Sequence, residues 1–145
     1  MTILPGALTI VVLLIALIHA YWGIGAVWPS RDSRTLARAV VGARGVERMP
    51  SPAACYAVAC LLLVVAVWPL VLIELVPFPG PDWLIYAVGT AMGLVFFLRG
   101  LAAYVPAWRR RMPEQPFATL DRRLFGPLCI ALGIGYFALV LRGFL

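Results

Sequence analysis

The sequence contains few charged residues and no lysine. Only 12% of its 145 residues are charged and 63% are hydrophobic, whereas about a quarter of the residues in a soluble domain are charged. The apolar residues form stretches of roughly 20, the length that crosses about 30 Å of hydrocarbon as an α-helix. The segments between them are too short to fold as a separate soluble domain. The composition therefore predicts an integral membrane protein without a catalytic module outside the bilayer.

Residues that usually bind metals or form disulfides are also scarce. The only histidine is His19, and the three cysteines are Cys55, Cys60 and Cys129. Because metal and haem sites usually need several ligands, we expect no metal and no cofactor. An odd number of cysteines without a Cys-x-x-Cys motif argues against a disulfide framework and a thiol oxidoreductase, so we expect buried packing residues. Phosphate-binding loops and Ser/His/Asp arrangements are missing, which disfavours nucleotide-binding and soluble hydrolase chemistry and leaves any catalytic residue unknown.

Four long apolar stretches predict a single all-α domain over residues 1–145, a bundle of four transmembrane helices. The predicted spans cover residues 4–28, 52–76, 82–105 and 124–144. The first lacks the basic start of a signal peptide, so we expect it to be a retained helix. Residues 117–125 form either the beginning of the last span or a separate interfacial segment, because Pro127 is tolerated only near a helix start. Residues 35–41 predict a short interfacial helix.

The arginines indicate how the spans are oriented. Residues 29–51 and 106–123 contain five arginines each, whereas the turn at residues 77–81 contains none. Loops on the cytoplasmic side of a membrane are enriched in positive charge. We therefore predict that both arginine-rich loops are cytoplasmic and that both termini lie on the other side. Since this is the pattern of an orientation signal, nucleic acid is not an expected partner.

Two polar residues lie inside predicted spans. Arg99 would cost at least about 2.5 kcal/mol if it faced lipid, so it needs a partner. Either it reaches the head groups or pairs with Asp121, which is a structural role, or it binds an anionic group beside His19. His19 either hydrogen-bonds a neighbouring helix or takes part in proton transfer or ligand binding. The topology predicts that further candidate ligand-binding residues approach the same leaflet: Trp22, Tyr104, Asp121, Arg122 and Arg123, with Tyr21 and Trp108 adjacent.

Glycines recur at helical spacing in the last two spans. Gly89 and Gly93 form a Gly-x-x-x-Gly pair that Gly100 extends, and Gly133 and Gly135 lie in the fourth span. Such small residues let neighbouring membrane helices approach closely, which predicts a compact bundle and no particular activity. Glu74, near the end of the second span, is expected at the membrane boundary.

Three stretches resemble domain-of-unknown-function family 3995. They are His19-Ala-Tyr-Trp22, Arg99-Gly100 with Tyr104, and Phe117-Ala-Thr-Leu-Asp-Arg-Arg-Leu-Phe-Gly-Pro-Leu-Cys129. The likeness covers nearly the whole chain, and the last stretch is its most specific part. It implies a small bacterial four-helix protein of the inner membrane and transfers no mechanism.

The chain departs from that family pattern at two places. Similar members have an acidic residue four positions after the arginine, where this chain has Ala103, and Tyr-Ser where it has Phe125-Gly126. Arg99 therefore has no acidic partner one turn away on its own span. Asp121 or an external anion is the expected partner of Arg99.

The polar residues predict a binding function. We expect an anionic lipid or another amphipathic ligand to bind at the cytoplasmic-side cluster, with Arg99 as the anion anchor and His19 as a hydrogen-bonding or proton-exchanging group. The alternative is an accessory subunit that packs its glycine-lined faces against a larger membrane complex. An enzyme acting on a lipidic substrate and a transporter that dimerises are less favoured. The expected partners are membrane lipids and, in the alternative, a larger complex or a second copy.

Overall fold

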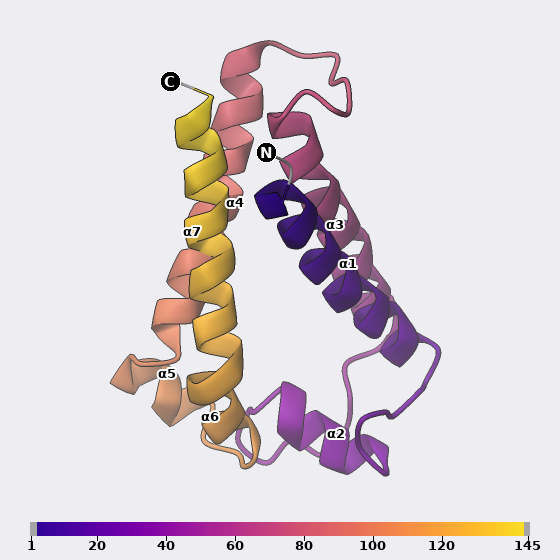
Figure 1. Cartoon of the computed structure of the whole chain (residues 1–145). Helices are drawn as coiled ribbons and strands as arrows, with labels where there is room; N and C mark the ends of the chain where they lie inside the picture. Colours follow the sequence, from indigo (N-terminus) through magenta and orange to yellow (C-terminus); the bar gives the residue numbers. More distant parts are fainter. Residues whose placement is uncertain (1–2, 144–145) are drawn as a thin grey trace.

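The computed structural model describes residues 3–143, and this part of the chain is entirely helical apart from its turns and loops (Figure 1). Four helices form the bundle: α1 (Ile3–Gly23), α3 (Pro52–Leu72), α4 (Asp82–Ala102) and α7 (Gly126–Arg142). Four short elements lie at one end of it: α2 (Ser33–Val40), α5 (Pro106–Arg111), α6 (Phe117–Leu120) and the π-helical η1 (Asp121–Phe125). Four helical segments are long and apolar enough to cross a membrane, which confirms the predicted fold class.

Three of the long helices end earlier than the predicted spans. α1 ends at Gly23, α3 at Leu72 and α4 at Ala102. The backbone turns after each of them: Gly25 has a φ of 86°, Glu74 has a φ of 60°, and Pro106 begins a new short helix. The apolar composition continues past these turns, and hydropathy alone therefore overestimates helix length.

The last span begins well before Pro127. Helix α6, η1 and α7 follow one another without interruption, so that residues Phe117–Arg142 form one segment long enough to cross a membrane. In a regular α-helix the ring of Pro127 would meet the carbonyl of the residue four positions earlier. The wider π-helical turn, in which Gly126 N donates to Asp121 O, lies directly before this proline. Residues 117–125 are thus the start of the last helix and not a separate segment.

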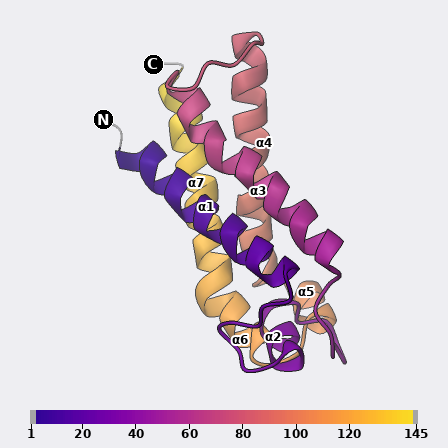
Figure 2. The same cartoon turned by 90° about the vertical axis from the view of Figure 1, so that its right-hand side faces the viewer.

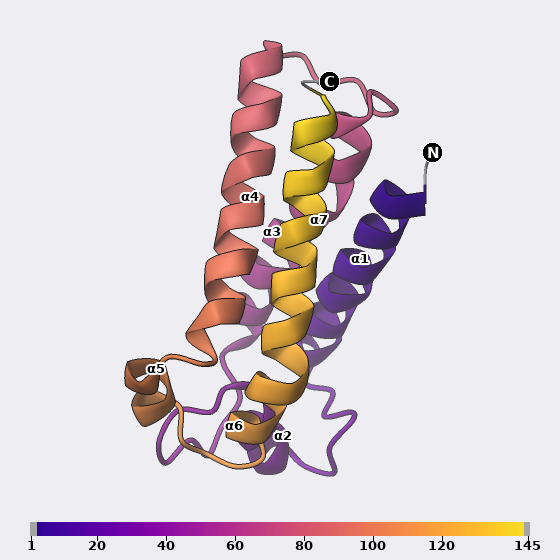
Figure 3. The ribbon, with the colours of Figure 1, turned by 60° about the vertical axis from the view of Figure 1, so that its left-hand side comes forward.

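The bundle consists of two helix pairs. Helix α1 packs along α3, and α4 packs along α7 (Figures 2 and 3). Buried residues join the pairs. They come from the first half of α1, the second half of α3 and the middle and later turns of α7, including Val12, Leu72, Leu132, Tyr136 and Val140. In Figure 1 the pairs accordingly lie close together near the turn between α3 and α4 and spread apart toward α2.

A hydrogen bond from Tyr136 joins the two pairs at a proline. Pro69 lies inside α3 and has no N–H, so the carbonyl of Val65, one turn earlier, lacks its helical donor. The hydroxyl of the fully buried Tyr136 on α7 donates to this carbonyl at 2.6 Å. The tyrosine therefore satisfies the backbone group that the proline leaves unpaired, as an apolar environment requires.

Glycines bring the backbones of α4 and α7 into direct contact. A Cβ atom added at Gly133 would lie 2.8 Å from the carbonyl oxygen of Gly93, and one added at Gly100 would lie 2.7 Å from that of Gly126. Gly135 instead faces Leu8 of α1. The predicted close helix packing is confirmed, and its main site is the α4–α7 contact.

The three cysteines are free, but they differ in burial. Cys55 is buried, Cys129 is partly buried and Cys60 is exposed. The expectation that all three are buried packing residues is wrong for Cys60. This residue lies on the face of α3 that points away from the other helices, which spacing along one helix cannot reveal.

The Tyr136 hydrogen bond makes a prediction that a double-mutant cycle can test. Replacing Tyr136 with Phe leaves the Val65 carbonyl without a donor, which should lower the free energy of unfolding in detergent by about 1 kcal/mol. In a Pro69→Ala background the new backbone N–H takes over, and the same Tyr136→Phe change should cost clearly less. Tyr56→Phe is the control, since this residue is half-exposed. Equal costs in both backgrounds would contradict the explanation.

The close contact at Gly133 predicts that one added methyl group destabilises the protein there but not at a glycine without close neighbours. Gly133→Ala pushes a Cβ against the backbone of α4, which should destabilise the bundle by about 1–3 kcal/mol. Gly6→Ala is the matched control because a Cβ at Gly6 would have no neighbour within 4 Å. Thermal unfolding in detergent measures both variants. A similar melting temperature for the two would show that α4 and α7 are not in backbone contact.

Candidate functional site at the arginine-rich end

The charges are divided unequally between the two ends of the bundle. The arginine-rich end, defined as residues 24–51 and 99–125, contains eleven arginines and four acidic residues. The opposite end has only Glu74, Asp82 and Arg142. The first end therefore has an excess of seven positive charges, and the second has an excess of one negative charge.

A buried carboxylate organises the inner edge of the arginine-rich end. Asp121 is only 3% exposed. Its Oδ1 accepts a hydrogen bond from Arg99 Nη2 at 2.7 Å, and its Oδ2 accepts one from Trp108 Nε1 at 2.9 Å. The Arg99 guanidinium also lies 5.0 Å from the centre of the Trp108 ring, within the range of a cation–π contact. We call Arg99, Trp108 and Asp121 the Asp121 cluster.

Three segments distant in sequence bring these side chains together. Arg99 lies in the last turn of α4, Trp108 lies in α5, and Asp121 begins η1. The contact between Gly100 and Gly126 places the end of α4 directly against the π-helical turn. Close backbone packing thus sets the distance between the arginine and the carboxylate.

The ion pair with Asp121 involves only one of the two terminal nitrogens of Arg99. Arg99 Nη1 is buried and has no hydrogen-bond partner in the described part of the chain, while about a third of the side chain remains exposed. A buried ion pair is stable only when its hydrogen bonds offset the cost of desolvation. The two hydrogen bonds to Asp121 and the Trp108 ring provide this compensation. The predicted pairing of Arg99 with Asp121 is observed, whereas the binding of an anion by Arg99 stays a prediction.

Arg122 and Arg123 lie beside the cluster but face outward. Successive helical residues point in different directions, so the inward position of Asp121 leaves the next two side chains exposed. The hydroxyl of Tyr104 donates to the carbonyl oxygen of Arg122 at 3.0 Å and attaches this turn to the end of α4. Both guanidinium groups are therefore presented from an ordered helical turn.

The first arginine-rich loop is attached to the second. Leu36 on α2 and Phe117 on α6 are both buried, and Gly42 lies against the Phe117 ring. Glu114 accepts a hydrogen bond from Gly45 N at 2.8 Å, and its other oxygen lies 4.0 Å from Arg38 Nε. The two loops therefore form one continuous surface at this end of the bundle.

Helix α2 has an acidic N-cap. Asp32 accepts hydrogen bonds from the backbone N–H and the hydroxyl of Thr35, and the backbone bond is the main reason why the pKa of Asp32 lies below its ordinary value. Protonation weakens such a cap, so its stabilisation is present above the ordinary pKa and is lost as the pH falls through the lowered one. At neutral pH the cap is fully formed.

Among residues 3–143, His19 forms its hydrogen bond within its own helix and none to another helix. Its Nδ1 donates to the carbonyl oxygen of Ile15, one turn earlier on α1, at 2.7 Å, and its ring lies 5.1 Å from that of Trp22. Trp22 Nε1 in turn donates to the carbonyl oxygen of Trp28. The expected interhelical hydrogen bond of His19 is therefore wrong, because a carbonyl of its own helix lies within reach.

The structure brings only some of the predicted site residues together. Arg99, Tyr104, Asp121, Arg122 and Arg123 belong to the α4–α7 pair, whereas His19, Tyr21 and Trp22 lie on α1 in the other pair. Trp108 was predicted to lie near the site, but its hydrogen bond to Asp121 was not predicted. No local sequence pattern indicates such a contact. Among residues 3–143, no three His, Cys, Asp or Glu residues form a group able to hold a metal ion.

The fold and the separation of charge define a small four-helix integral membrane protein with one strongly basic end. Within this class, the chain belongs to the family described as Protein of unknown function (DUF3995), which matches residues 12–136. The matched range includes the whole Asp121 cluster, all of α3 and α4, and most of α1 and α7. None of the curated proteins and none of the solved structures compared with the chain matches it.

The Asp121 cluster makes a prediction about stability. Asp121→Ala leaves Arg99 unpaired inside the bundle and should lower the free energy of unfolding by about 3 kcal/mol. Adding Arg99→Met should recover part of this loss, because it removes the unpaired charge. Glu47→Ala, which breaks the exposed pair with Arg34, is the control and should cost less than about 1 kcal/mol. If the double variant were less stable than Asp121→Ala alone, the two side chains would not act as a pair.

Proposed function

We propose that this protein is a multi-pass protein of the bacterial inner membrane, with both termini outside the cytoplasm, and that its arginine-rich end binds anionic phospholipid head groups. The observation that carries the proposal is the exposure of Arg122 and Arg123 on an ordered helical turn at the end of a membrane-crossing segment. Arginines in a flexible loop would need no role other than orienting the protein in the membrane. Arginines held in a fixed turn at the membrane boundary also support recognition of a phosphate.

The proposed site consists of residues that bind the phosphate and residues that position them. Arg122 and Arg123 provide two guanidinium groups, each able to donate paired hydrogen bonds to a phosphate. The exposed part of Arg99 adds positive charge at the same level of the helix pair. Asp121 and Trp108 act as positioning residues, since they hold the turn from which both arginines project. His19 and Trp22 remain secondary candidates on the neighbouring pair.

The proposal predicts a loss of lipid retention in one variant. The protein is reconstituted in nanodiscs containing equal amounts of phosphatidylglycerol and phosphatidylcholine, extracted gently, and examined by native mass spectrometry. The wild-type protein should retain phosphatidylglycerol preferentially. Because each arginine near the surface contributes about 1 kcal/mol, Arg122→Gln with Arg123→Gln should reduce this preference by at least about tenfold.

A second double variant tests whether lipid retention depends on Arg122 and Arg123 in particular or only on the total positive charge. Arg31→Gln with Arg48→Gln removes the same charge from exposed positions of the other loop. This variant should keep most of the preference for phosphatidylglycerol. Equal losses in both double variants, or no preference in the wild-type protein, would contradict a site at Arg122 and Arg123. Gentle extraction with a larger protein in fixed proportion would instead support the role of an accessory subunit.

A further inference from the structure

The end of the bundle opposite the arginines contains two adjoining cavities, of about 300 Å³ and 270 Å³. Both are lined by Leu72, Glu74 and Tyr86. Asp82 also lines the larger cavity, and Arg142 the smaller one. The larger volume lies at the lower limit of the range of ligand pockets and the smaller one just below it, which leaves room for a head group and not for a whole lipid. We call these two cavities the turn pocket.

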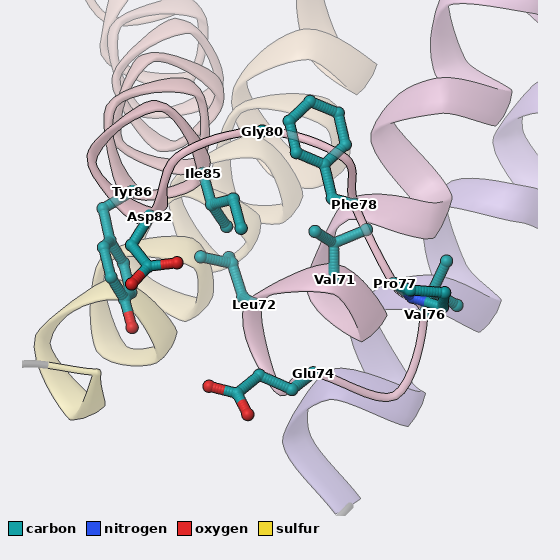
Figure 4. A pocket seen from close by; sticks show the side chains of 10 residues that line it. All are labelled: Val71, Leu72, Glu74, Val76, Pro77, Phe78, Gly80, Asp82, Ile85 and Tyr86. Atoms are coloured by element: carbon teal, nitrogen blue, oxygen red, sulfur yellow. The ribbon is translucent and has the colours of Figure 1, made fainter.

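The end of α3 places a carboxylate at this pocket. Leu75 N donates to Leu70 O at 2.9 Å and Glu74 N donates to Val71 O at 3.0 Å, the pattern of a Schellman motif. The left-handed position of this motif is usually glycine, but here it is Glu74 with a φ of 60°. In Figure 4 the carboxylates of Glu74 and Asp82 and the hydroxyl of Tyr86 point toward the space beside Leu72.

Acidic and basic side chains both line the turn pocket, and within residues 3–143 they form no ion pair with each other. Within residues 3–143 the ion pairs are Arg34–Glu47, Arg38–Glu114 and Arg99–Asp121, all at the arginine-rich end. Glu74 and Arg142 line the same smaller cavity, yet their charged atoms are farther apart than the 4.0 Å of an ion pair. A ligand that carries a cation and an anion on adjacent groups would complement both side chains.

One wall of the larger cavity is apolar, and its surroundings are typical of a membrane boundary. Val71, Phe78 and Ile85 line the larger cavity together with Leu72. Leu75 and Trp83 flank the turn and are 67% and 69% exposed. Tryptophan at such a position is characteristic of the membrane–water interface. A ligand at this level would therefore have a polar head and an apolar continuation.

From this arrangement we infer that the turn pocket binds the head group of a zwitterionic phospholipid with a protonated primary amine. The ammonium group donates to the carboxylates of Glu74 and Asp82, and the phosphate pairs with Arg142. The apolar wall contacts the first carbons of the lipid. A quaternary ammonium lacks N–H donors, and an anionic head group would face two carboxylates, so both bind less well. The inference rests on other residues than the proposed function and does not depend on it.

The test uses the full chain in nanodiscs with equal amounts of phosphatidylethanolamine, phosphatidylcholine and phosphatidylglycerol. Native mass spectrometry after gentle extraction measures the ratio of retained phosphatidylethanolamine to phosphatidylcholine. The wild-type protein should show a ratio well above one. Glu74→Gln removes the partner of N–H donors that only phosphatidylethanolamine has, so it should reduce the ratio by about tenfold. Arg142→Gln removes the partner of a phosphate that both lipids carry, so it should reduce the amount of phosphatidylethanolamine retained per protein by about tenfold.

Matched controls keep the outcome interpretable. Glu47→Gln makes the same chemical change at the arginine-rich end and should leave the ratio unchanged. The Glu74 and Arg142 side chains are exposed and outside every ion pair among residues 3–143, and melting temperatures will show that both variants fold. Soluble phosphoethanolamine, added to the wild-type protein as a competitor, shows whether the head group alone is recognised or the lipid is required.

Three results would overturn the inference. They are a wild-type ratio near one, an unchanged ratio in Glu74→Gln, and an unchanged amount of retained phosphatidylethanolamine in Arg142→Gln, the last of which would exclude recognition of the phosphate. Retention of phosphatidylglycerol through Arg122 and Arg123 is measured in the same spectra. Failure of one site is therefore distinguishable from failure of the other.

Discussion

Direct backbone contact between α4 and α7 is the constraint on which the arginine-rich end depends. Gly93, Gly100, Gly126 and Gly133 leave no room for a Cβ atom between the two helices. Because the helices touch at this distance, Arg99 reaches Asp121, and the π-helical turn lies against the end of α4. The outward direction of Arg122 and Arg123 follows from the inward direction of Asp121. A larger residue at one glycine would therefore disturb packing, the ion pair and the charged surface together.

The connection between the two helix pairs is of a different kind. The pairs meet in the half of the bundle near the turn, where Tyr136 supplies the hydrogen bond that Pro69 removes from α3. Toward the other end they spread apart in Figure 1, and the docked loops connect them through Glu114 and Phe117. One end is thus held by packing between the long helices, and the other by polar and apolar contacts between the loops.

The two ends differ in charge and therefore in the head groups that they would attract. An excess of seven positive charges at one end favours anionic phosphates, whereas Glu74, Asp82 and Arg142 at the other present both signs around a small cavity. A bundle with this separation can contact both leaflets through different chemistry. Both proposed lipid sites rest on exposed side chains near the ends of the long apolar helices, where a head group would be the nearest source of opposite charge.

Much of the fold and part of the candidate site could be predicted from the sequence. Four apolar stretches determine four membrane-crossing helices, because hydropathy is a property of each segment by itself. The cost of an isolated arginine in hydrocarbon pointed to Asp121 as the partner of Arg99. The partner of His19 was mispredicted, since helical residues have carbonyls of their own helix within reach. The exposure of Cys60 was mispredicted because burial depends on which neighbours a helix meets.

The sequence by itself determined the number of helices, their approximate extents and the separation of charge between the two ends. Only the tertiary structure decided that α1 pairs with α3 and α4 with α7, that Trp108 completes the Asp121 cluster, and that Glu74 and Arg142 line one cavity. The reason is physical: these features depend on distances between residues far apart in the chain. Such distances are set by how closely the helix backbones approach, which in this bundle depends on a few glycines.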